Sequence, residues 1–161
     1  MIQRIQSIFL VLVIASLVSS VFFVFWVKSD ETSQEAVNLY AQEMVKLKIV
    51  DGEQKEVAQS EHIYLFILPL LIAGIAAYSL FQFNNRMRQM QLGALNSLLL
   101  AVNLGLLIWR TTAMDDMIAT TTYDFPAFGF YSLIGAMIFN LSANRFIRRD
   151  EKLVKSMDRI R

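Results

Sequence analysis

Four long stretches of this chain contain no Asp, Glu, Lys, Arg or His, and they limit what the chain can fold into. They are Ile5 to Val27, Ile63 to Asn85, Gln89 to Trp109 and Phe125 to Asn144. Each is close to the roughly 20 residues that an α-helix needs to cross about 30 Å of hydrocarbon. Charged residues make up only 18% of the chain, against about 25% in an average soluble protein. We therefore predict an all-α membrane protein, an antiparallel bundle of four transmembrane helices in a single domain, with helices at about residues 5–27, 63–84, 90–109 and 126–145.

The basic residues are distributed unevenly between the segments that join these stretches. Ten of the 15 lie before the first stretch, between the second and third stretches, or after the fourth stretch. They are Arg4, Arg86, Arg88, Arg145, Arg148, Arg149, Lys152, Lys155, Arg159 and Arg161, and the last six belong to the tail at 146–161. Because short loops rich in Lys and Arg stay in the cytoplasm, we predict that both termini are cytoplasmic. The segments 28–62 and 110–125 then form the outer loops.

The first stretch also raises the question of a cleaved signal peptide. It ends in the bulky run Val21-Phe-Phe-Val-Phe-Trp26, whereas signal peptidase prefers small residues at the cleavage site. We therefore predict that the stretch is a retained helix.

The outer loop 28–62 is compatible with two local structures. Thr32-Ser-Gln-Glu35 fits a helix-capping box, and Val37, Tyr40, Ala41, Met44 and Val45 follow it at helical spacing. This pattern predicts an amphipathic helix to about residue 47. The alternative is a hairpin about Asp51-Gly52, because Lys46 to Ile49 alternates and Asp-Gly is a strong turn signal.

The strongest polar groups inside the predicted spans are asparagines. Asn96 and Asn103 are seven residues apart and so share one face of the third helix, and Asn140 lies in the fourth. They are candidate intramembrane polar contacts, either hydrogen bonds between helices or a polar pathway for a solute. A proton- or ion-coupled transporter usually keeps ionisable residues in its spans, and these stretches contain none.

Residues that could carry chemistry are few and lie in the outer segments. His62 follows Glu61 at the start of the second helix, and we predict that it caps the helix rather than binding a metal, which needs three or four ligands. A catalytic site would have to combine His62 with Asp115, Asp116 and Asp124. We expect no enzyme activity, no metal and no cofactor, and the net charge of +1 gives no reason to expect a nucleic-acid partner.

The C-terminal tail is the most strongly patterned segment. Its apolar residues Ile147, Leu153, Val154, Met157 and Ile160 follow helical spacing among charged ones. The pattern predicts an amphipathic helix that either lies on anionic lipid headgroups or docks on a partner. The candidate docking residues are Arg145, Arg148, Arg149, Asp150, Glu151, Lys152, Lys155, Asp158, Arg159 and Arg161.

Three segments also carry a resemblance. The opening Met1-Ile-Gln-Arg-Ile-Gln6, the linker Asn85-Arg-Met-Arg-Gln89 and above all Ala143 to Arg161 resemble an uncharacterised family of small four-helix membrane proteins of the Bacteroidota (domain-of-unknown-function family 4293). The resemblance implies an inner-membrane location and a tail that belongs to the family's common function. It implies no activity, cofactor or binding residue.

Together these patterns predict a small non-enzymatic membrane protein, an accessory or scaffold subunit whose basic tail is the docking element. Its partners would be membrane lipids and a protein in the membrane. Pairs of small residues four apart are typical of helix–helix contacts and support this hypothesis: Ser16 and Ser20, Ala73 and Ala77, Ala101 and Gly105, Ser132 and Ala136. The alternative is a small channel or permease for a neutral solute that uses the three asparagines.

Overall fold

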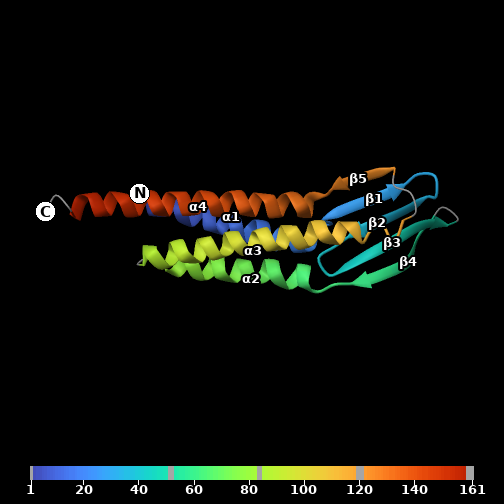
Figure 1. Ribbon diagram of the computed structural model, residues 1–161, viewed down its shortest axis with the longest axis horizontal. Helices are drawn as coiled ribbons and strands as arrows, with labels where there is room; N and C mark the ends of the chain where they lie inside the picture. Colours follow the sequence, from blue (N-terminus) through green and yellow to red (C-terminus); the bar gives the residue numbers. More distant parts are fainter. Residues whose placement is uncertain (1, 51–52, 83–84, 119–121, 159–161) are drawn as a thin grey trace.

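The protein is a long bundle of four helices with a β-sheet at one end (Figure 1). The computed structural model describes residues 2–50, 53–82, 85–118 and 122–158. The helices run up and down in chain order: α1 (Ile2–Phe22), α2 (Tyr64–Phe81), α3 (Arg86–Thr112) and α4 (Phe128–Asp158). The end of the bundle opposite the sheet, where α4 ends, is called the distal end below.

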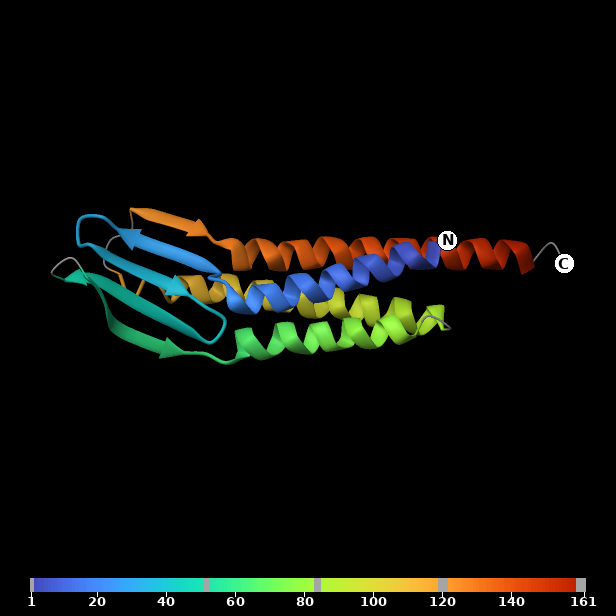
Figure 2. The same ribbon diagram turned by 180° about the vertical axis from the view of Figure 1, so that it is seen from behind.

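The prediction of an all-α fold is wrong, because the segments predicted as outer loops form a five-stranded antiparallel sheet and the fold is mixed α/β. The strands are β1 (Trp26–Asp30), β2 (Glu35–Leu39), β3 (Glu43–Val50), β4 (Glu53–Glu61) and β5 (Tyr123–Pro126), in the order β4-β3-β2-β1-β5. Figure 2 shows β1, β4 and β5 continuing the lines of α1, α2 and α4. The sheet is therefore built as an extension of the bundle.

The predicted amphipathic helix in segment 28–62 is also wrong. The proposed capping box is instead a turn after β1, in which the Asp30 carboxylate accepts hydrogen bonds from the backbone N–H groups of Thr32 and Ser33 at 3.0 and 3.3 Å. Asp side chains favour such local turns over helix. The hairpin alternative is confirmed by the pairing of β3 with β4, whose register joins Val50 to Glu53; Asp51 and Gly52 lie outside the described residues.

One face of the sheet is covered by residues 113–118, which follow α3. Met114 and Ile118 are buried there beside Val37 and Leu39 of β2. Lys46 of β3 donates a hydrogen bond to the carbonyl oxygen of Met117 at 2.7 Å. Within the predicted outer loop 110–125, residues 113–118 thus form a layer on the sheet, and residues 123–125 belong to strand β5.

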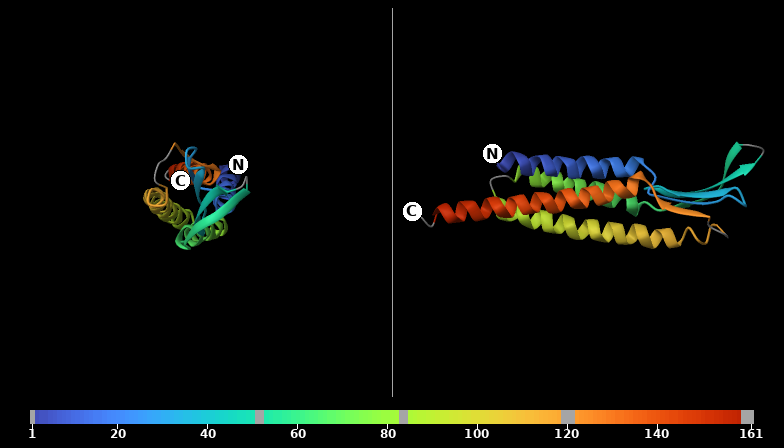
Figure 3. Two further views of the ribbon diagram at one scale, coloured as in Figure 1. Left: turned by 90° about the vertical axis from the view of Figure 1, so that its right-hand side faces the viewer. Right: turned by 90° about the horizontal axis from the view of Figure 1, so that it is seen from above.

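The four helices pack in a ring, with contacts between α1 and α4, α1 and α2, α2 and α3, and α3 and α4. The end view in Figure 3 shows this arrangement. Each helix contributes a stripe of small and aliphatic side chains to a common core, including Leu10, Val13, Leu17, Ile72, Ala76, Leu100, Leu107, Leu133 and Ala136. Large apolar side chains such as Ile8, Leu98 and Ile138 are exposed on the outside of the ring, as expected for a surface that faces lipid.

Within the described residues, three helical segments are long and apolar enough to cross a membrane: Ile5–Phe22, Tyr64–Phe81 and Arg86–Thr112. This is consistent with membrane association. Helix α4 is not among them, since polar residues such as Asn140, Ser142 and Asn144 interrupt its apolar part before the charges begin. It is nevertheless packed along α1 for much of its length (Figures 1 and 2).

The junction between bundle and sheet is tight. Trp26 packs edge-on against Phe130 with ring centres 5.3 Å apart, and Gly129 N–H donates to the Val24 carbonyl at 2.9 Å. A β-carbon at Gly129 would lie only 2.8 Å from the Val24 oxygen and 2.9 Å from the Phe23 oxygen. The close approach of α4 to the end of α1 therefore requires glycine.

Candidate functional site: a basic pocket between α3 and α4

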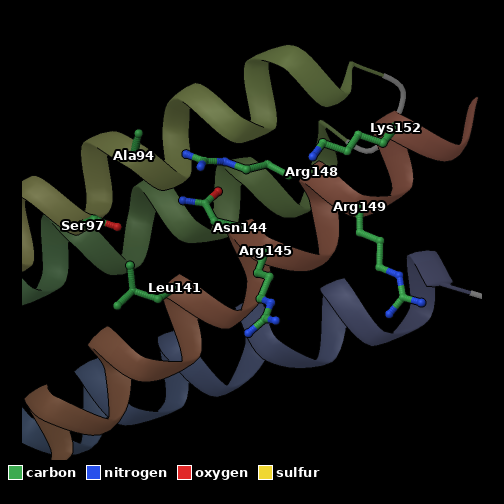
Figure 4. A pocket seen from close by; sticks show the side chains of 8 residues that line it. All are labelled: Ala94, Ser97, Leu141, Asn144, Arg145, Arg148, Arg149 and Lys152. Carbon is green, nitrogen blue, oxygen red and sulfur yellow. The ribbon is translucent and has the colours of Figure 1, made fainter. Parts of the chain in front are cut away.

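A pocket of about 760 Å³ opens between α3 and α4 near the distal end. Ligand sites are typically about 300–1,000 Å³. Its lining residues come from two faces, Ala94 and Ser97 of α3 and six residues of α4: Leu141, Asn144, Arg145, Arg148, Arg149 and Lys152. In Figure 4, Asn144 and Arg148 extend from α4 toward the part of α3 where Ala94 and Ser97 lie. Four of the predicted docking residues therefore line one pocket.

Next to the pocket, α3 and α4 are joined by contacts between Gly93, Ser97 and Asn140. The Asn140 amide donates to the Gly93 carbonyl and to the Ser97 hydroxyl, both at 2.9 Å, and Ser97 donates to the Gly93 carbonyl at 3.0 Å. A β-carbon at Gly93 would lie 2.2 Å from Asn144 Oδ1. Glycine at this position allows α3 and α4 to approach closely enough to hold Asn144 at the pocket.

The charge around the pocket is unbalanced. Among the described residues that line it there are four basic side chains and no carboxylate, and the ion pairs of the described residues involve none of these four cations. The nearby Asp150 is instead paired with Arg86 at the start of α3, with 3.1 Å between Nη2 and Oδ2. Asp150, predicted as a docking residue, thus ties α4 to α3.

The predicted helical tail is confirmed as far as Asp158, as the continuation of α4, so the predicted fourth span and the tail form one helix. Its first apolar residue, Ile147, is buried in the bundle, whereas Arg145, Arg148, Arg149 and Lys152 are exposed and Glu151 is half-buried. The side chains of Lys155 and Asp158, and residues Arg159 and Arg161 altogether, lie outside the described part of the chain.

The three asparagines predicted to lie in the membrane differ from one another. Asn140 forms the hydrogen bonds between helices described above. Asn96 and Asn103 share the buried face of α3, and both have an exposed fraction of 0%. Neither has a hydrogen-bond partner within the described part of the structure, so the predicted interhelical bonds are found for Asn140 alone of the three.

Two of the acidic residues considered for catalysis, Asp115 and Asp124, are paired with a buried lysine. Lys28 Nζ lies 2.5 Å from Asp115 and 3.4 Å from Asp124, and Asp124 also accepts a hydrogen bond from the Trp26 indole. Burial lowers the pKa of Lys28, but the hydrogen bond to Asp115 and the charges of both carboxylates outweigh it, and the net pKa is raised. Asp116 is exposed. Asp115 and Asp124 are therefore brought together in an ion-paired cluster.

His62 is buried but does not cap α2, so that prediction is wrong. Its Nε2 lies 3.0 Å from the Tyr40 carbonyl oxygen and its Nδ1 lies 3.3 Å from that of Ser60. Burial lowers the pKa of His62, and the positive charge of Arg110 lowers it further. The hydrogen bonds to the two carbonyl oxygens raise the pKa but do not outweigh these effects, so the net pKa is lowered. The contact with Tyr40 thus links the junction of β4 and α2, where His62 lies, to the turn after β2. The described residues contain no group of three or more His, Cys, Asp or Glu side chains that could hold a metal ion.

A family model described as a domain of unknown function (DUF4293) matches residues 2–160. The chain belongs to this family. No curated protein matches it.

Sequence reasoning found the basic residues of the pocket but missed Ala94, Ser97, Leu141 and Asn144. One signal was available, because Leu141, Asn144, Arg148 and Lys152 follow each other at steps of three and four along α4 and share one face. On this face Asn144 lies between the apolar Leu141 and the two cations. The pocket lies at this boundary between the apolar and the charged part of α4.

Proposed function

We propose that this chain is a non-enzymatic accessory or scaffold subunit of the bacterial inner membrane that packs into a larger complex, with the basic end of α4 as the docking element. In this proposal all four helices cross the membrane. Both termini are cytoplasmic, and the sheet lies on the outer side.

The observation that carries this proposal is the length of α4. At the distal end, α4 continues past α2, α3 and the start of α1 as a single helix (Figures 1 and 2). Leu153 is exposed on this extension beside Lys152. A single helix with apolar and charged residues gains most of its stability from packing against another surface, which a partner subunit would provide.

The outward face of α3 supports lateral packing. Ala101 and Gly105 are both exposed there, and a β-carbon at Gly105 would meet no atom within 4 Å. Small residues four apart on a lipid-facing surface let a second helix approach closely. This pair is free to serve a helix of another chain, whereas Ala73 and Ala136 are used inside the bundle.

The distribution of charge supports the orientation. Arg86, Arg88 and the basic residues of α4 lie at the distal end, and the sheet end carries most acidic residues. The chain has no cysteine, so a single cysteine is a clean label site. A cysteine at Gln54 should react with an impermeant maleimide in intact cells, and one at Ser156 only after permeabilisation. The opposite pattern would contradict the orientation.

The main experiment is affinity purification after gentle solubilisation. Wild-type protein should recover a partner in fixed stoichiometry, and Leu153→Asp and Gly105→Leu should each lose it while the protein stays in the membrane. Lys55→Glu, at the far edge of the sheet, is the matched control and should retain the partner. Recovery of wild-type protein alone, or only as copies of itself, would refute the proposal.

The proposal of a non-enzymatic role is supported by how the candidate groups are occupied. Asp115 and Asp124 neutralise Lys28, and the ring nitrogens of His62 face backbone carbonyls. General acid–base catalysis needs a group within hydrogen-bond reach of a substrate, whereas these groups are committed to the sheet.

One observation favours a second candidate function, a channel or permease for a neutral solute. Asn96 and Asn103 present buried amides without partners in the described structure, and Asn140 lies on the facing helix. Flux of neutral solutes into proteoliposomes would have to fall when Asn96 and Asn103 are both changed to Leu. Unchanged flux in that variant would exclude the pathway.

A further inference from the structure

We propose that the pocket between α3 and α4 binds the headgroup of an anionic phospholipid whose headgroup carries hydroxyl groups, with phosphatidylglycerol as the simplest example. This inference rests on the membrane placement proposed above, but not on the existence of a protein partner.

The phosphate would be recognised by the basic side chains. Arg148 and Lys152 lie one helical turn apart on α4, Arg148 beside Asn144 (Figure 4). Arg binds phosphate oxygens through two parallel N–H groups and Lys through a point charge. Because no described carboxylate lines the pocket, a single negative charge is attracted without having to displace an internal partner.

The hydroxyl groups would be recognised by Asn144. The exposed fraction of residue Asn144 is only 6%. Its side-chain oxygen Oδ1 is buried without a hydrogen-bond partner in the described structure. A buried carbonyl oxygen without a donor has lost its hydrogen bonds to water without replacing them, which is unfavourable. Asn144 Oδ1 lies against Gly93 of α3, so in this proposal the amide turns toward the pocket, where a headgroup hydroxyl donates the hydrogen bond that a phosphodiester cannot provide.

The surroundings favour a lipid over a soluble anion. Besides its cations, the pocket is lined by the apolar residues Ala94 and Leu141. Toward the sheet, α3 exposes Leu95 and Leu98 and α4 exposes Ile138. This apolar surface runs toward the sheet from the point where the charges of α4 begin. A phospholipid fits this arrangement, since its phosphate meets the cations while its acyl chains lie along the two helices.

The test compares lipids of matched charge on purified protein in a neutral detergent, counting bound lipid by native mass spectrometry. Phosphatidylglycerol and phosphatidylmethanol carry the same phosphodiester charge, but only the first has hydroxyl donors. We expect wild-type protein to bind phosphatidylglycerol about fivefold more tightly than phosphatidylmethanol, as one hydrogen bond of about 1 kcal/mol implies, and phosphatidylcholine much more weakly. Asn144→Leu should abolish the preference between the first two lipids.

The charge is tested with two matched variants. Arg148→Gln should weaken binding of both anionic lipids by about tenfold, as loss of a charged hydrogen bond implies. Arg88→Gln removes an exposed cation at the same end but outside the pocket and should leave binding unchanged. Soluble glycerol 3-phosphate at equal concentration should not compete, since it lacks the acyl chains.

Three results would overturn the proposal. Equal losses for Arg148→Gln and Arg88→Gln would show general attraction to charge, and full competition by glycerol 3-phosphate would show a soluble ligand. Cross-links from the pocket to a co-purified acidic protein segment, without lipid selectivity, would show a protein occupant. The membrane placement is tested separately, by whether the chain stays in the membrane fraction after an alkaline carbonate wash.

Discussion

The sheet end and the helical bundle differ in how their buried polar groups are satisfied. At the sheet end, Lys28 is paired with Asp115 and Asp124, and the buried Asp30 accepts hydrogen bonds from Thr32, Ser33 and Thr122. In the bundle, Asn96 and Asn103 are as deeply buried but have no partner in the described structure. Directional polar contacts fix the register of the sheet, whereas the bundle is fixed by apolar packing and tolerates unsatisfied amides at a cost.

The largest effect should come from removing the counter-charges of Lys28. Asp115→Asn combined with Asp124→Asn leaves a buried ammonium group without a carboxylate, and we expect a loss of about 3 kcal/mol in the free energy of unfolding. Lys28→Met should cost less, because both carboxylates are about half exposed and regain water. Unfolding followed by Trp26 fluorescence in a Trp109→Phe background measures this, and equal losses in the two variants would contradict the argument.

A second prediction concerns the joint between the two regions. Gly129→Ala should lower stability by about 2 kcal/mol through overpacking, because the new β-carbon meets backbone oxygens of Phe23 and Val24, which cannot move aside like a side chain. Gly105→Ala is the matched control on an open helix face and should not destabilise the isolated protein. Thermal unfolding in detergent should separate the two variants clearly, and indistinguishable midpoints would count against a tight joint.

In the bundle, the two asparagines without hydrogen-bond partners should respond to substitution with the opposite sign. Asn96→Leu or Asn103→Leu should stabilise the isolated protein by about 1 kcal/mol, because each removes a buried amide without a partner. Asn140→Leu should destabilise it by a similar amount, since it removes hydrogen bonds to Gly93 and Ser97. Chemical unfolding in mixed micelles measures both, and a loss of stability for all three would place Asn96 and Asn103 in satisfied networks.

The smallest effect concerns pH at the sheet end. The folded-state pKa of His62 is lowered, chiefly by burial. As pH falls, His62 is therefore protonated at a higher pH in the unfolded chain than in the folded protein. The stability contributed by neutral His62 is complete above the unfolded pKa of about 6.5 and is lost as pH falls toward the folded pKa, by at most about 1.4 kcal/mol per pH unit. Unfolding midpoints between pH 7.5 and 5.5 should decline in wild type and remain flatter in His62→Gln; parallel declines would exclude His62 as the cause.

The helices could be predicted from the sequence because hydropathy is a local property. Each of the four stretches without charge contains most of one helix. The predicted end of the first helix at residue 27 was too late, since Trp26 and Val27 belong to β1, where they pair with Leu39 and Asn38 of β2 and with Pro126 and Phe125 of β5. A residue about 100 positions away thus decides the state of Trp26, and no local pattern reports it.

The sheet was missed for a related reason. Val37, Tyr40, Ala41, Met44 and Val45 have helical spacing, but Val37 and Leu39 also alternate as a strand requires. Their state is decided by pairing with β1 and β3 and by the cover that Met114 and Ile118 provide. The pocket was half predicted: its cations stand out in the sequence, but Ala94 and Ser97 belong to it only because α3 packs beside α4.

The pairing of β1 with β5 has a consequence for the order of assembly. A nascent chain completes β1 to β4 early, but β1 has no neighbour on its second edge until residues 123–126 are synthesised and α3 is in place. Until then the hydrogen-bonding groups along that edge are open to any other extended chain. Truncated or stalled chains that end before Tyr123 would therefore be prone to aggregate through β1, and completion of the sheet must wait until the chain has been synthesised past α3 to Pro126.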